Sequence, residues 1–297
     1  MKCYLCQSIN SKKISERLRG YSEEDSKHRY MLKCDNCELV YISNMDHITE
    51  NFYENSNMLP DDIAANFNKW NRLNNNDNQR RLEQFSNLLL NKDILDFGAG
   101  SGGFLKKVKE LSNSYDLVEP DNSLADFLEK EFHKPVYRSI NAIPSSSKYD
   151  VIFMFHVVEH LKDPAEMLRN MSKHLKPNGC IIVEVPNADD ALISIYNNSG
   201  FRNFFYWDCH LFYFNNKTIS KLAEKANLEI EYVKQLQRYP ISNTLYWLSN
   251  NKPGGHHIYD FLDSKALNKQ YEASLAAVGK CDTIVAKLKF RSDDEKR

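Results

Sequence analysis

The chain has 297 residues, of which 42% are hydrophobic and 12% aromatic, enough for one large α/β domain with a small appendage. Its 39 lysine and arginine residues against 40 aspartate and glutamate residues give a formal net charge of -1. This balance provides no global field for nucleic acid or an anionic membrane, so we expect a small-molecule or sugar substrate and no nucleic-acid partner. The longest apolar run, Val151 to Phe155 with Val157 and Val158 beyond it, is too short to cross a bilayer. The N-terminus also lacks the apolar segment of a signal peptide, so we expect a cytoplasmic protein without membrane insertion.

Two cysteine pairs mark the first part of the chain, which we delimit as a module of residues 1–45. Cys3 and Cys6 form one C-x-x-C pair, and Cys34 and Cys37 form the second. Because the cytosol keeps thiols reduced, this spacing predicts a tetrahedral zinc site rather than disulfides. Four thiolates leave no open position on the metal, so the zinc is expected to be structural. A redox role for one pair is the alternative, and it is less attractive because neither pair follows a strand of a β-α-β unit.

Residues 46–90 are expected to form a helical linker or cap. Apolar residues recur there at helical spacing in two groups, and the polar stretch from Asn74 to Asn78 separates the groups. The pattern therefore predicts two helices. Their apolar positions are Ile63, Phe67 and Trp70 in the first, and Leu82, Phe85 and Leu89 in the second.

Residues 91–297 are predicted to form one α/β domain. Short apolar runs alternate with amphipathic stretches, which is typical of β-α-β units and a parallel sheet. An aromatic-rich segment at 196–214 is too irregular to assign, and an insertion near 238–262 is expected to cover the site as a polar loop that includes His256 and His257. We expect strands at 93–97, 115–119, 149–155, 180–185, 229–233 and 283–290, and helices at 102–111, 123–132, 164–175 and 217–226.

A glycine-rich turn follows the first of these strands. Gly98, Gly100 and Gly103 satisfy the pattern G-x-G-x-x-G between a strand and a helix, which makes a nicotinamide or flavin enzyme one interpretation. Two acidic residues favour another interpretation. Asp96 stands two positions before the first glycine, and Glu119 ends the next strand, nineteen positions after Gly100.

This ordered set resembles the first two motifs of the class I S-adenosylmethionine-dependent methyltransferases, and the resemblance covers about residues 90–235. It implies a Rossmann-like, seven-stranded, mostly parallel sheet with helices on both faces and an antiparallel last strand. It implies that Asp96 helps to hold the amino group of S-adenosylmethionine, and that Glu119 accepts hydrogen bonds from the ribose hydroxyls. Gly98 and Gly100 would approach the methionyl part. Asn141 stands where the family often has an acid before its adenine-contacting stretch, and it is a further cofactor-binding candidate.

The string His156-x-x-Glu159-His160 also matches a zinc-protease signature of the inverted type. We reject that interpretation because the string begins directly after an apolar strand, so the histidines need not share one helical face. The resemblance places His156 at the carboxyl end of the fourth strand, where open α/β sheets bind ligands. His156 is therefore a candidate for both the cofactor site and catalysis. Hydrogen bonding that fixes the loop explains His160 at least as well.

The aromatic segment from Tyr206 to Phe214 follows the fifth strand, where the family places residues that face the substrate. His210 is our first choice for a general base, because a hydroxyl acceptor must lose its proton and histidine suits that task near neutral pH. Tyr206 and His156 are the alternative catalytic candidates. An interior histidine in an aromatic cluster is the competing interpretation of His210.

A zinc module followed by a methyltransferase domain resembles sugar methyltransferases. We therefore expect O-methylation of a hydroxyl of a nucleotide sugar or polysaccharide precursor. A methyltransferase acting on a small quinone, phenol or amine is the alternative enzyme. A zinc-containing binding or scaffold protein without catalysis is the alternative from another class, and Asp96, Gly98, Gly100 and Glu119 argue against it.

Overall fold

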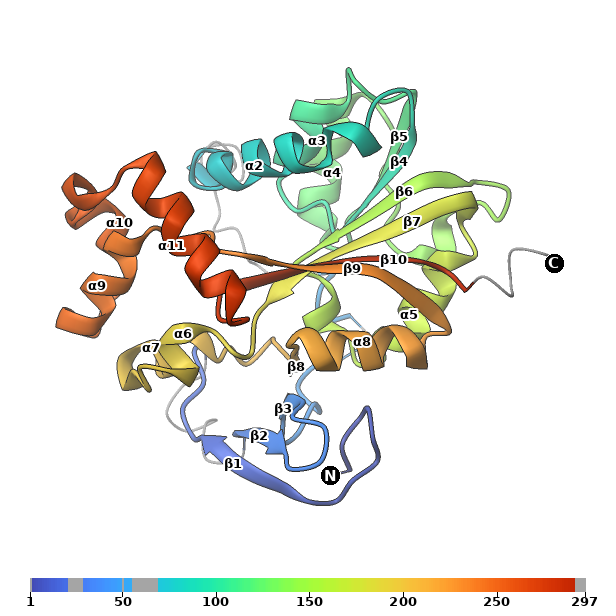
Figure 1. Cartoon of the computed structure of the whole chain (residues 1–297). Coiled ribbons are helices and arrows are strands. Elements are labelled where there is room, and N and C mark those ends of the chain that lie inside the picture. Colours follow the sequence, from blue (N-terminus) through green and yellow to red (C-terminus); the bar gives the residue numbers. More distant parts are fainter. Residues whose placement is uncertain (1, 21–28, 50, 55–68, 292–297) are drawn as a thin grey trace.

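A mixed sheet of six strands forms the centre of the fold (Figure 1). The computed structural model describes residues 2–20, 29–49, 51–54 and 69–291. The strand at 283–290 runs antiparallel to both of its neighbours, and the first four strands in the sheet order are parallel. This arrangement confirms the Rossmann-like fold class with its antiparallel last strand. The order across the sheet is β5 (Ser114–Val118), β4 (Asp93–Phe97), β6 (Tyr149–Phe155), β7 (Leu175–Pro186), β10 (Thr283–Phe290) and β9 (Leu228–Leu236).

The expected seventh strand is reduced to a single bridge in the described part of the chain. Tyr137 pairs with Val118 at the outer side of β5, and its backbone N–H and C=O bond to Leu117 and Glu119. Pro135 lies two positions earlier and cannot donate a ladder hydrogen bond, which limits how far this pairing can extend. The count of seven strands is therefore corrected to six.

Helices cover both faces of the sheet because successive strand residues point to opposite sides (Figure 1). Ile94 and Phe153 pack with the helices on one face, whereas Leu95 and Ile152 belong to the apolar core on the other. The first face carries α2 (Asn75–Phe85), α3 (Gly103–Val108) and α4 (Asn122–Phe132), and the second carries α5 (Pro164–Ser172) and α8 (Asn216–Lys225).

A second sheet of four strands joins the N-terminal cysteine segment to the main domain. Its last strand, β8, comes from the aromatic segment that the sequence left unassigned, and β8 pairs antiparallel with β3. The same segment contributes the helix α7 (Ser199–Phe205). Arg19 and the strand β3 are thereby held against residues 206–214. The strand order is β1 (Ser11–Ser15), β2 (Met31–Cys34), β3 (Val40–Ile42) and β8 (Phe212–Tyr213).

Helices fill the segment between β9 and β10, where the sequence predicted an insertion with a polar loop (Figure 1). His256 and His257 lie in a short helix of this segment, so the expectation of a loop is corrected there. The helical segment also continues past residue 262 to Ala277. It consists of α9 (Ile241–Asn250), α10 (Gly255–Ile258), a 3-10 turn at Asp260–Leu262, and α11 (Lys265–Ala277).

The break between the two predicted helices is confined to a turn at Asn74, because α2 begins at Asn75 and runs through the rest of the polar stretch. Asn78 and Arg81 on this helix are buried, and Arg81 donates both to Asn78 within the helix and to Glu184 on the sheet. Of the first predicted helix, Ile63 and Phe67 lie outside the described residues, and Trp70 lies in a helical stretch at 69–73.

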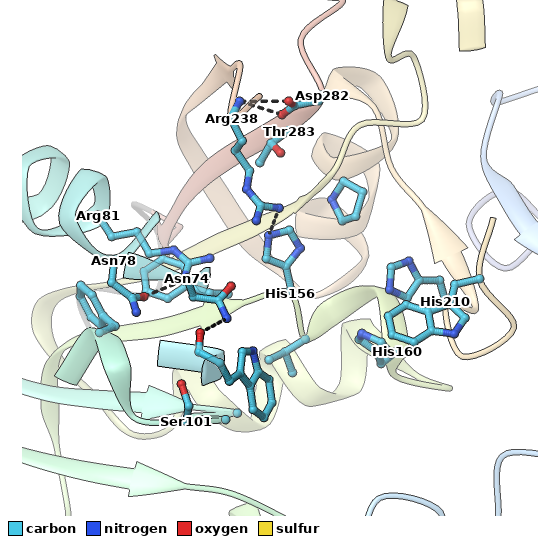
Figure 2. Close-up of a pocket in the computed structure, with 18 of the residues that line it drawn as sticks. Asn74, Asn78, Arg81, Ser101, His156, His160, His210, Arg238, Asp282 and Thr283 are labelled. Atoms are coloured by element: carbon cyan, nitrogen blue, oxygen red, sulfur yellow. Dashed lines mark hydrogen bonds between the residues drawn. The ribbon is translucent and has the colours of Figure 1, made fainter. Parts of the chain in front are cut away.

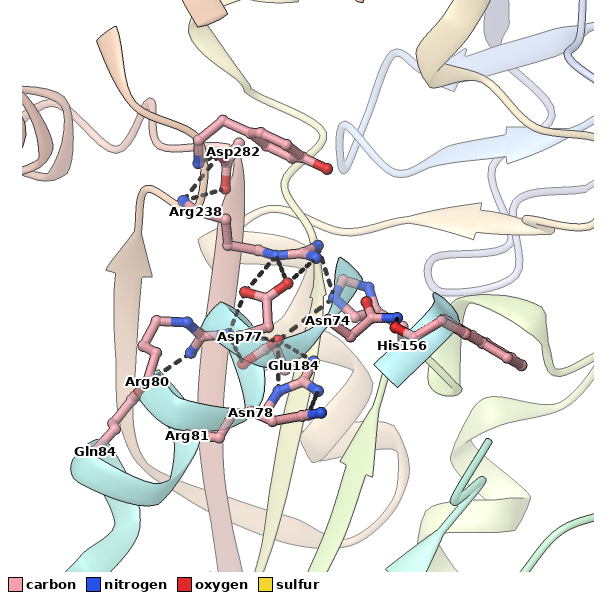
Figure 3. Close-up of polar contacts among 12 residues, drawn as sticks. Asn74, Asp77, Asn78, Arg80, Arg81, Gln84, His156, Glu184, Arg238 and Asp282 are labelled. Carbon is pink, nitrogen blue, oxygen red and sulfur yellow. Dashed lines mark hydrogen bonds and ion pairs between the residues drawn. The ribbon is translucent and has the colours of Figure 1, made fainter. Parts of the chain in front are cut away.

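A buried ion network fastens α2 to the sheet (Figure 3). The carboxylate of Glu184 on β7 has no exposed surface and lies 2.6 Å from Arg81 and 3.0 Å from Arg80. Burial alone would raise the pKa of Glu184, but Arg81, His156 and Arg80 hold it well below its usual range. Glu184 is thus a buried anion compensated by two guanidinium groups.

The network extends to the strand β9 and its following turn. Asp77 on α2 lies 3.2 Å from Arg80 and forms a second ion pair with Arg238, which lies two residues after the end of β9. Arg238 also bonds to His156 at the end of β6, at 3.0 Å between Nη1 and Nε2 (Figure 3). The network therefore joins α2, β6, β7 and the β9 end.

We expect Glu184→Gln to lower the free energy of unfolding by about 3–5 kcal/mol, since the buried Arg81 and the half-buried Arg80 would lose their shared anionic partner. Urea titration followed by circular dichroism measures this change. The matched control is Glu231→Gln, which breaks an exposed pair with Lys287 at 3.0 Å and should cost less than about 1 kcal/mol. Equal losses in the two variants would contradict the structural role of the network.

Candidate functional site

One cavity of about 1100 Å³ opens where the parallel strands end, at the edge at which open α/β sheets bind ligands (Figure 2). Pockets for a single small ligand usually measure about 300–1,000 Å³, so this cavity has room for two ligands. The glycine turn after β4 and Glu119 line one part of it. The aromatic segment and the helices α9 and α11 line another.

The glycine turn brings bare backbone to the cavity wall. Gly98 and Gly100 have positive φ angles of 79° and 53°, which residues with a side chain rarely adopt. A Cβ atom at Gly98 would also lie 2.4 Å from Cγ2 of Val157. Gly103 meets a different demand, because a Cβ atom there would lie 2.5 Å from Asn71 and Asn78. The third glycine thus permits the close approach of α2.

Two buried carboxyls flank this turn. Asp96 is 3% exposed and Glu119 is 6% exposed, and both line the cavity. Burial raises the pKa of each carboxyl to about 7, and the charge of Arg81 partly opposes the shift at Asp96. Glu119 accepts hydrogen bonds from the backbone N–H groups of Gly100 at 2.7 Å and Asp121 at 3.0 Å. A ligand that offers cationic or hydroxyl donors here would stabilise the charged forms.

Asn141, a candidate for cofactor binding, does not reach the cavity. It is exposed in the middle of a 3-10 turn at Ile140–Ala142, which directs it to solvent. Ile140 and Ser139 line the cavity instead.

His156 ends β6 with a positive φ of 55°, and its ring lines the cavity. Its Nε2 atom lies 3.0 Å from Arg238, and its Nδ1 atom lies 3.2 Å from a carboxylate oxygen of Glu159. Because a guanidinium only donates, Nε2 accepts when the ring is neutral, and Nδ1 then donates its proton to Glu159. Both ring nitrogens of His156 are therefore engaged. Burial and Arg238 oppose the charged ring, but Glu159 and Glu184 raise the pKa of His156 above its ordinary value.

His210 and His160 lie side by side in the cavity wall (Figure 2). Their ring centres are 4.5 Å apart, with the rings nearly perpendicular. The Nδ1 atom of His160 donates to the backbone C=O of Cys209 at 3.0 Å, which supports a role in fixing the loop. The Nδ1 atom of His210 is buried and has no hydrogen-bond partner among the described residues.

The surroundings of His210 favour its neutral form. Burial, followed by the charges of His160, His156 and Arg19, lowers the pKa of His210 well below its ordinary value. The ring is therefore uncharged near neutral pH and has a nitrogen lone pair available to accept a proton.

Tyr206, the third catalytic candidate, is placed beneath the cavity wall rather than in it. It is 1% exposed and packs against Phe205 and Tyr213, with ring centres 5.3 and 5.2 Å away. Burial raises the pKa of its hydroxyl. Its position beneath the wall gives the hydroxyl no access to a ligand in the cavity.

The four cysteines of the N-terminal module converge on one point. The Sγ atoms of Cys3 and Cys37 are 3.5 Å apart, as are those of Cys6 and Cys34, and all four lie within 4.8 Å of one another. Four sulfurs at about 2.3 Å from a tetrahedral zinc would be separated by about 3.8 Å. The donor set and its spacing therefore fit a closed zinc site.

Several residues of the cavity were missed by the sequence analysis. Asn74, Asn78 and Arg81 line it from one face of α2 and the residue before it (Figure 2). Their spacing of four and then three positions places them on one helical face, and this polar stripe was the available signal. Arg19 and Trp247 come from distant parts of the chain and carry no comparable signal.

A family model described as a methyltransferase domain matches residues 69–233, more than half of the chain. The chain is 26% identical over 115 residues to the ubiquinone biosynthesis O-methyltransferase of Rickettsia conorii. It is 28% identical over 118 residues to the tRNA U34 carboxymethyltransferase of Campylobacter jejuni. Each match covers 37% of this chain and 40% of the relative, so the chain spans about two fifths of the length of these curated relatives.

The fold is similar to that of a solved S-adenosylmethionine-dependent methyltransferase from Thermotoga maritima, described as a possible histamine N-methyltransferase. The TM-score is 0.51 at 18% identity, and the match covers 76% of this chain and 95% of that one. Among the described residues, no helix combines the length and apolar character needed to span a membrane.

Proposed function

Since the chain belongs to the methyltransferase-domain family, we propose that it is an S-adenosylmethionine-dependent methyltransferase that methylates a hydroxyl oxygen of a sugar. One observation carries the proposal. The ring of His210, which burial keeps neutral and whose Nδ1 has no hydrogen-bond partner among the described residues, lines the same cavity as the glycine turn and its two buried carboxyls. The cavity thus offers a cofactor end and a proton acceptor within one enclosure.

At the cofactor end, Asp96 would accept a hydrogen bond from the ammonium group of S-adenosylmethionine, and Glu119 would accept hydrogen bonds from its ribose hydroxyls. Ionised carboxylates suit both tasks because they are acceptor-only groups. Gly98 and Gly100 would let the ligand lie against the backbone. The bound cofactor supplies an electrophilic methyl group on a sulfonium. The chain's own contribution is to hold that group in line with the acceptor and to exclude water.

At the acceptor end, His210 would take the proton of the acceptor hydroxyl as general base. Its lowered pKa keeps it unprotonated, and burial shields it from competing water. His156 has both nitrogens occupied and serves better as a positioning residue between Arg238 and Glu159.

The lining of the acceptor end favours a sugar over a flat aromatic acceptor. Asn243 and Thr244 line the cavity and carry hydrogen-bonding groups for a polyol. The aromatic rings of Phe204 and Trp207 also line it and provide apolar surface for the polyol's C–H groups.

A quinone or phenol is the second candidate acceptor. The same aromatic rings would stack on it, and the ubiquinone biosynthesis relative is named for such chemistry. The tRNA-modifying relative raises nucleic acid as a further acceptor class, so the absence of a nucleic-acid partner stays a prediction based on the balanced charge.

We also propose that Cys3, Cys6, Cys34 and Cys37 bind one structural zinc ion. Cys34 ends β2, which pairs with β3, and β3 in turn pairs with β8 beside His210. The metal would therefore stabilise the strand pairing that positions the aromatic segment.

We expect Cys34→Ser to reduce the zinc content from about one ion per chain to a small fraction, because a tetrahedral site with three thiolates binds far less tightly. Elemental mass spectrometry of the purified protein measures the ratio. Cys180→Ala, which changes a buried cysteine of the central sheet, should leave the zinc content unchanged. Undiminished zinc in the Cys34 variant would place the ion elsewhere, for example at His160, Cys209 and His210, whose ligand atoms also lie within 4.8 Å of one another.

We expect the affinity for S-adenosylmethionine to weaken as pH falls through 7. Asp96 and Glu119 have a pKa of about 7 in the free protein, and ligand donors would favour their ionised forms. From pH 8 to pH 6, each carboxyl should weaken binding by about tenfold. Isothermal titration gives these values.

Two variants assign the pH dependence. Asp96→Asn and Glu119→Gln should each lower the affinity and remove their own share of the pH effect, whereas Glu110→Gln on the exposed surface should change neither. Binding of NADH in place of S-adenosylmethionine would refute the cofactor assignment.

We expect His210→Gln to lower kcat by roughly 10²–10⁴-fold, the usual contribution of a general base, with little change in cofactor affinity. The wild-type rate should hold as pH falls through about 6.5 and decline only below, because the pKa of His210 is lowered. Product formation from panels of nucleotide sugars and of catechols, followed by mass spectrometry, measures the rate and decides between the two acceptor classes.

The control is His133→Asn, since His133 is exposed and has a left-handed backbone that asparagine also tolerates. Full turnover by the His210 variant would exclude His210 as the base.

A further inference from the structure

The N-terminal module places an arginine in the wall of the cavity. The guanidinium carbon of Arg19 lies 4.1 Å from the ring centre of Trp207 and 4.5 Å from that of Phe204. The backbone fixes this position, because Arg19 donates to the C=O of Tyr206 at 2.7 Å and accepts from the N–H of Asp208 at 3.1 Å. Arg19 is thus held on the aromatic segment that carries His210.

The other arginines that line the cavity are already paired with carboxylates. Arg81 lies 2.6 Å from Glu184, Arg138 lies 2.6 Å from Asp126, and Arg238 pairs with Asp77. Within the described ranges, no carboxylate lies within ion-pair distance of Arg19. A guanidinium has five N–H donors, and the aromatic rings contact its faces, so with respect to the described residues its edge can donate to a ligand.

We propose that Arg19 binds an oxyanion of the acceptor, either a phosphate or a carboxylate. A guanidinium presents parallel N–H groups that match both of these groups in a bidentate manner. This inference rests on the proposed function and narrows it, because the acceptor sugar would be phosphorylated or acidic. It also gives the cysteine module a direct part in substrate recognition.

The position of Arg19 couples the acceptor's charge to the base. The positive charge of Arg19 is one of the influences that lower the pKa of His210. An anion bound to Arg19 would offset that charge and raise the proton affinity of His210. The correct acceptor would thereby strengthen the base at the moment when its hydroxyl needs to be deprotonated.

The test is isothermal titration of the zinc-loaded full chain with inorganic pyrophosphate and, separately, with malonate. Arg19→Gln should weaken the binding of at least one anion by about 10–100-fold, the usual worth of charge-assisted hydrogen bonds. Arg19→Lys should retain part of the affinity, since it keeps the charge and loses the bidentate fork. The anion that responds identifies the acceptor group as phosphate or carboxylate. Arg17→Gln is the matched control, because Arg17 is exposed on the same segment and does not line the cavity.

A second readout separates anion binding from a merely structural role. The pH midpoint of the His210 ring protons in the NMR spectrum should rise when the wild-type protein binds the anion. In Arg19→Gln it should be higher at the outset and should not respond to the anion.

Binding of neither anion by the wild-type protein would overturn the proposal, and so would equal binding by Arg19→Gln. This measurement requires no methyl transfer. Anion binding with no transfer to any acceptor would therefore count against the proposed function alone, whereas transfer that ignores Arg19 would count against this inference alone.

Discussion

The fold depends on one buried carboxylate. Glu184 has no contact with solvent, yet it remains ionised because Arg80 and Arg81 approach it from α2 and His156 lies 3.4 Å away. A buried charge without partners would be costly, so these side chains must stay together for the protein to fold. Through Asp77 and Arg238 the same network reaches the end of β9, which sets the position of the helices that follow. The ion network around Glu184 therefore positions several of the elements that line the cavity.

Burial raises the pKa of the acids at one end of the cavity and lowers the pKa of the histidine at the other end. Both shifts have one physical reason. Desolvation penalises the charged form of any group, so it raises the pKa of Asp96 and Glu119 and lowers that of His210. Hydrogen-bond donors would stabilise the ionised acids, and the neutral histidine can accept a proton. A cofactor that brings cationic and hydroxyl groups suits the first end, and a hydroxyl acceptor suits the second.

The N-terminal module is part of the site through strand pairing. The β3–β8 ladder and the backbone bonds of Arg19 hold residues 206–214 between the module and the main sheet. Arg19 then lines the same cavity as Trp207 and His210, although it is remote from both in the chain. A cysteine cluster far from the cavity's chemistry can thus influence it, because it stabilises the sheet that carries these side chains.

Local spacing along the chain was enough to predict several features. The alternation of apolar runs predicted β-α-β units and a parallel sheet, the resemblance to class I methyltransferases implied the antiparallel last strand, and the cysteine pairs converge as expected. Asp96 and Glu119 lie at strand ends beside the glycine turn and line the cavity. Tertiary structure decided the rest. Asn141 is exposed to solvent, Tyr206 is buried beneath the cavity wall, and Arg19 lines the cavity. None of these positions can be predicted from the residues next to them in the chain. The polar residues at 74–78 favour a break locally, yet the chain leaves the helix only at Asn74, and Arg81 on α2 pairs with the buried Glu184. Periodicity reports which face of an element is apolar, whereas the partner that a polar side chain meets is set by contacts between segments far apart in sequence.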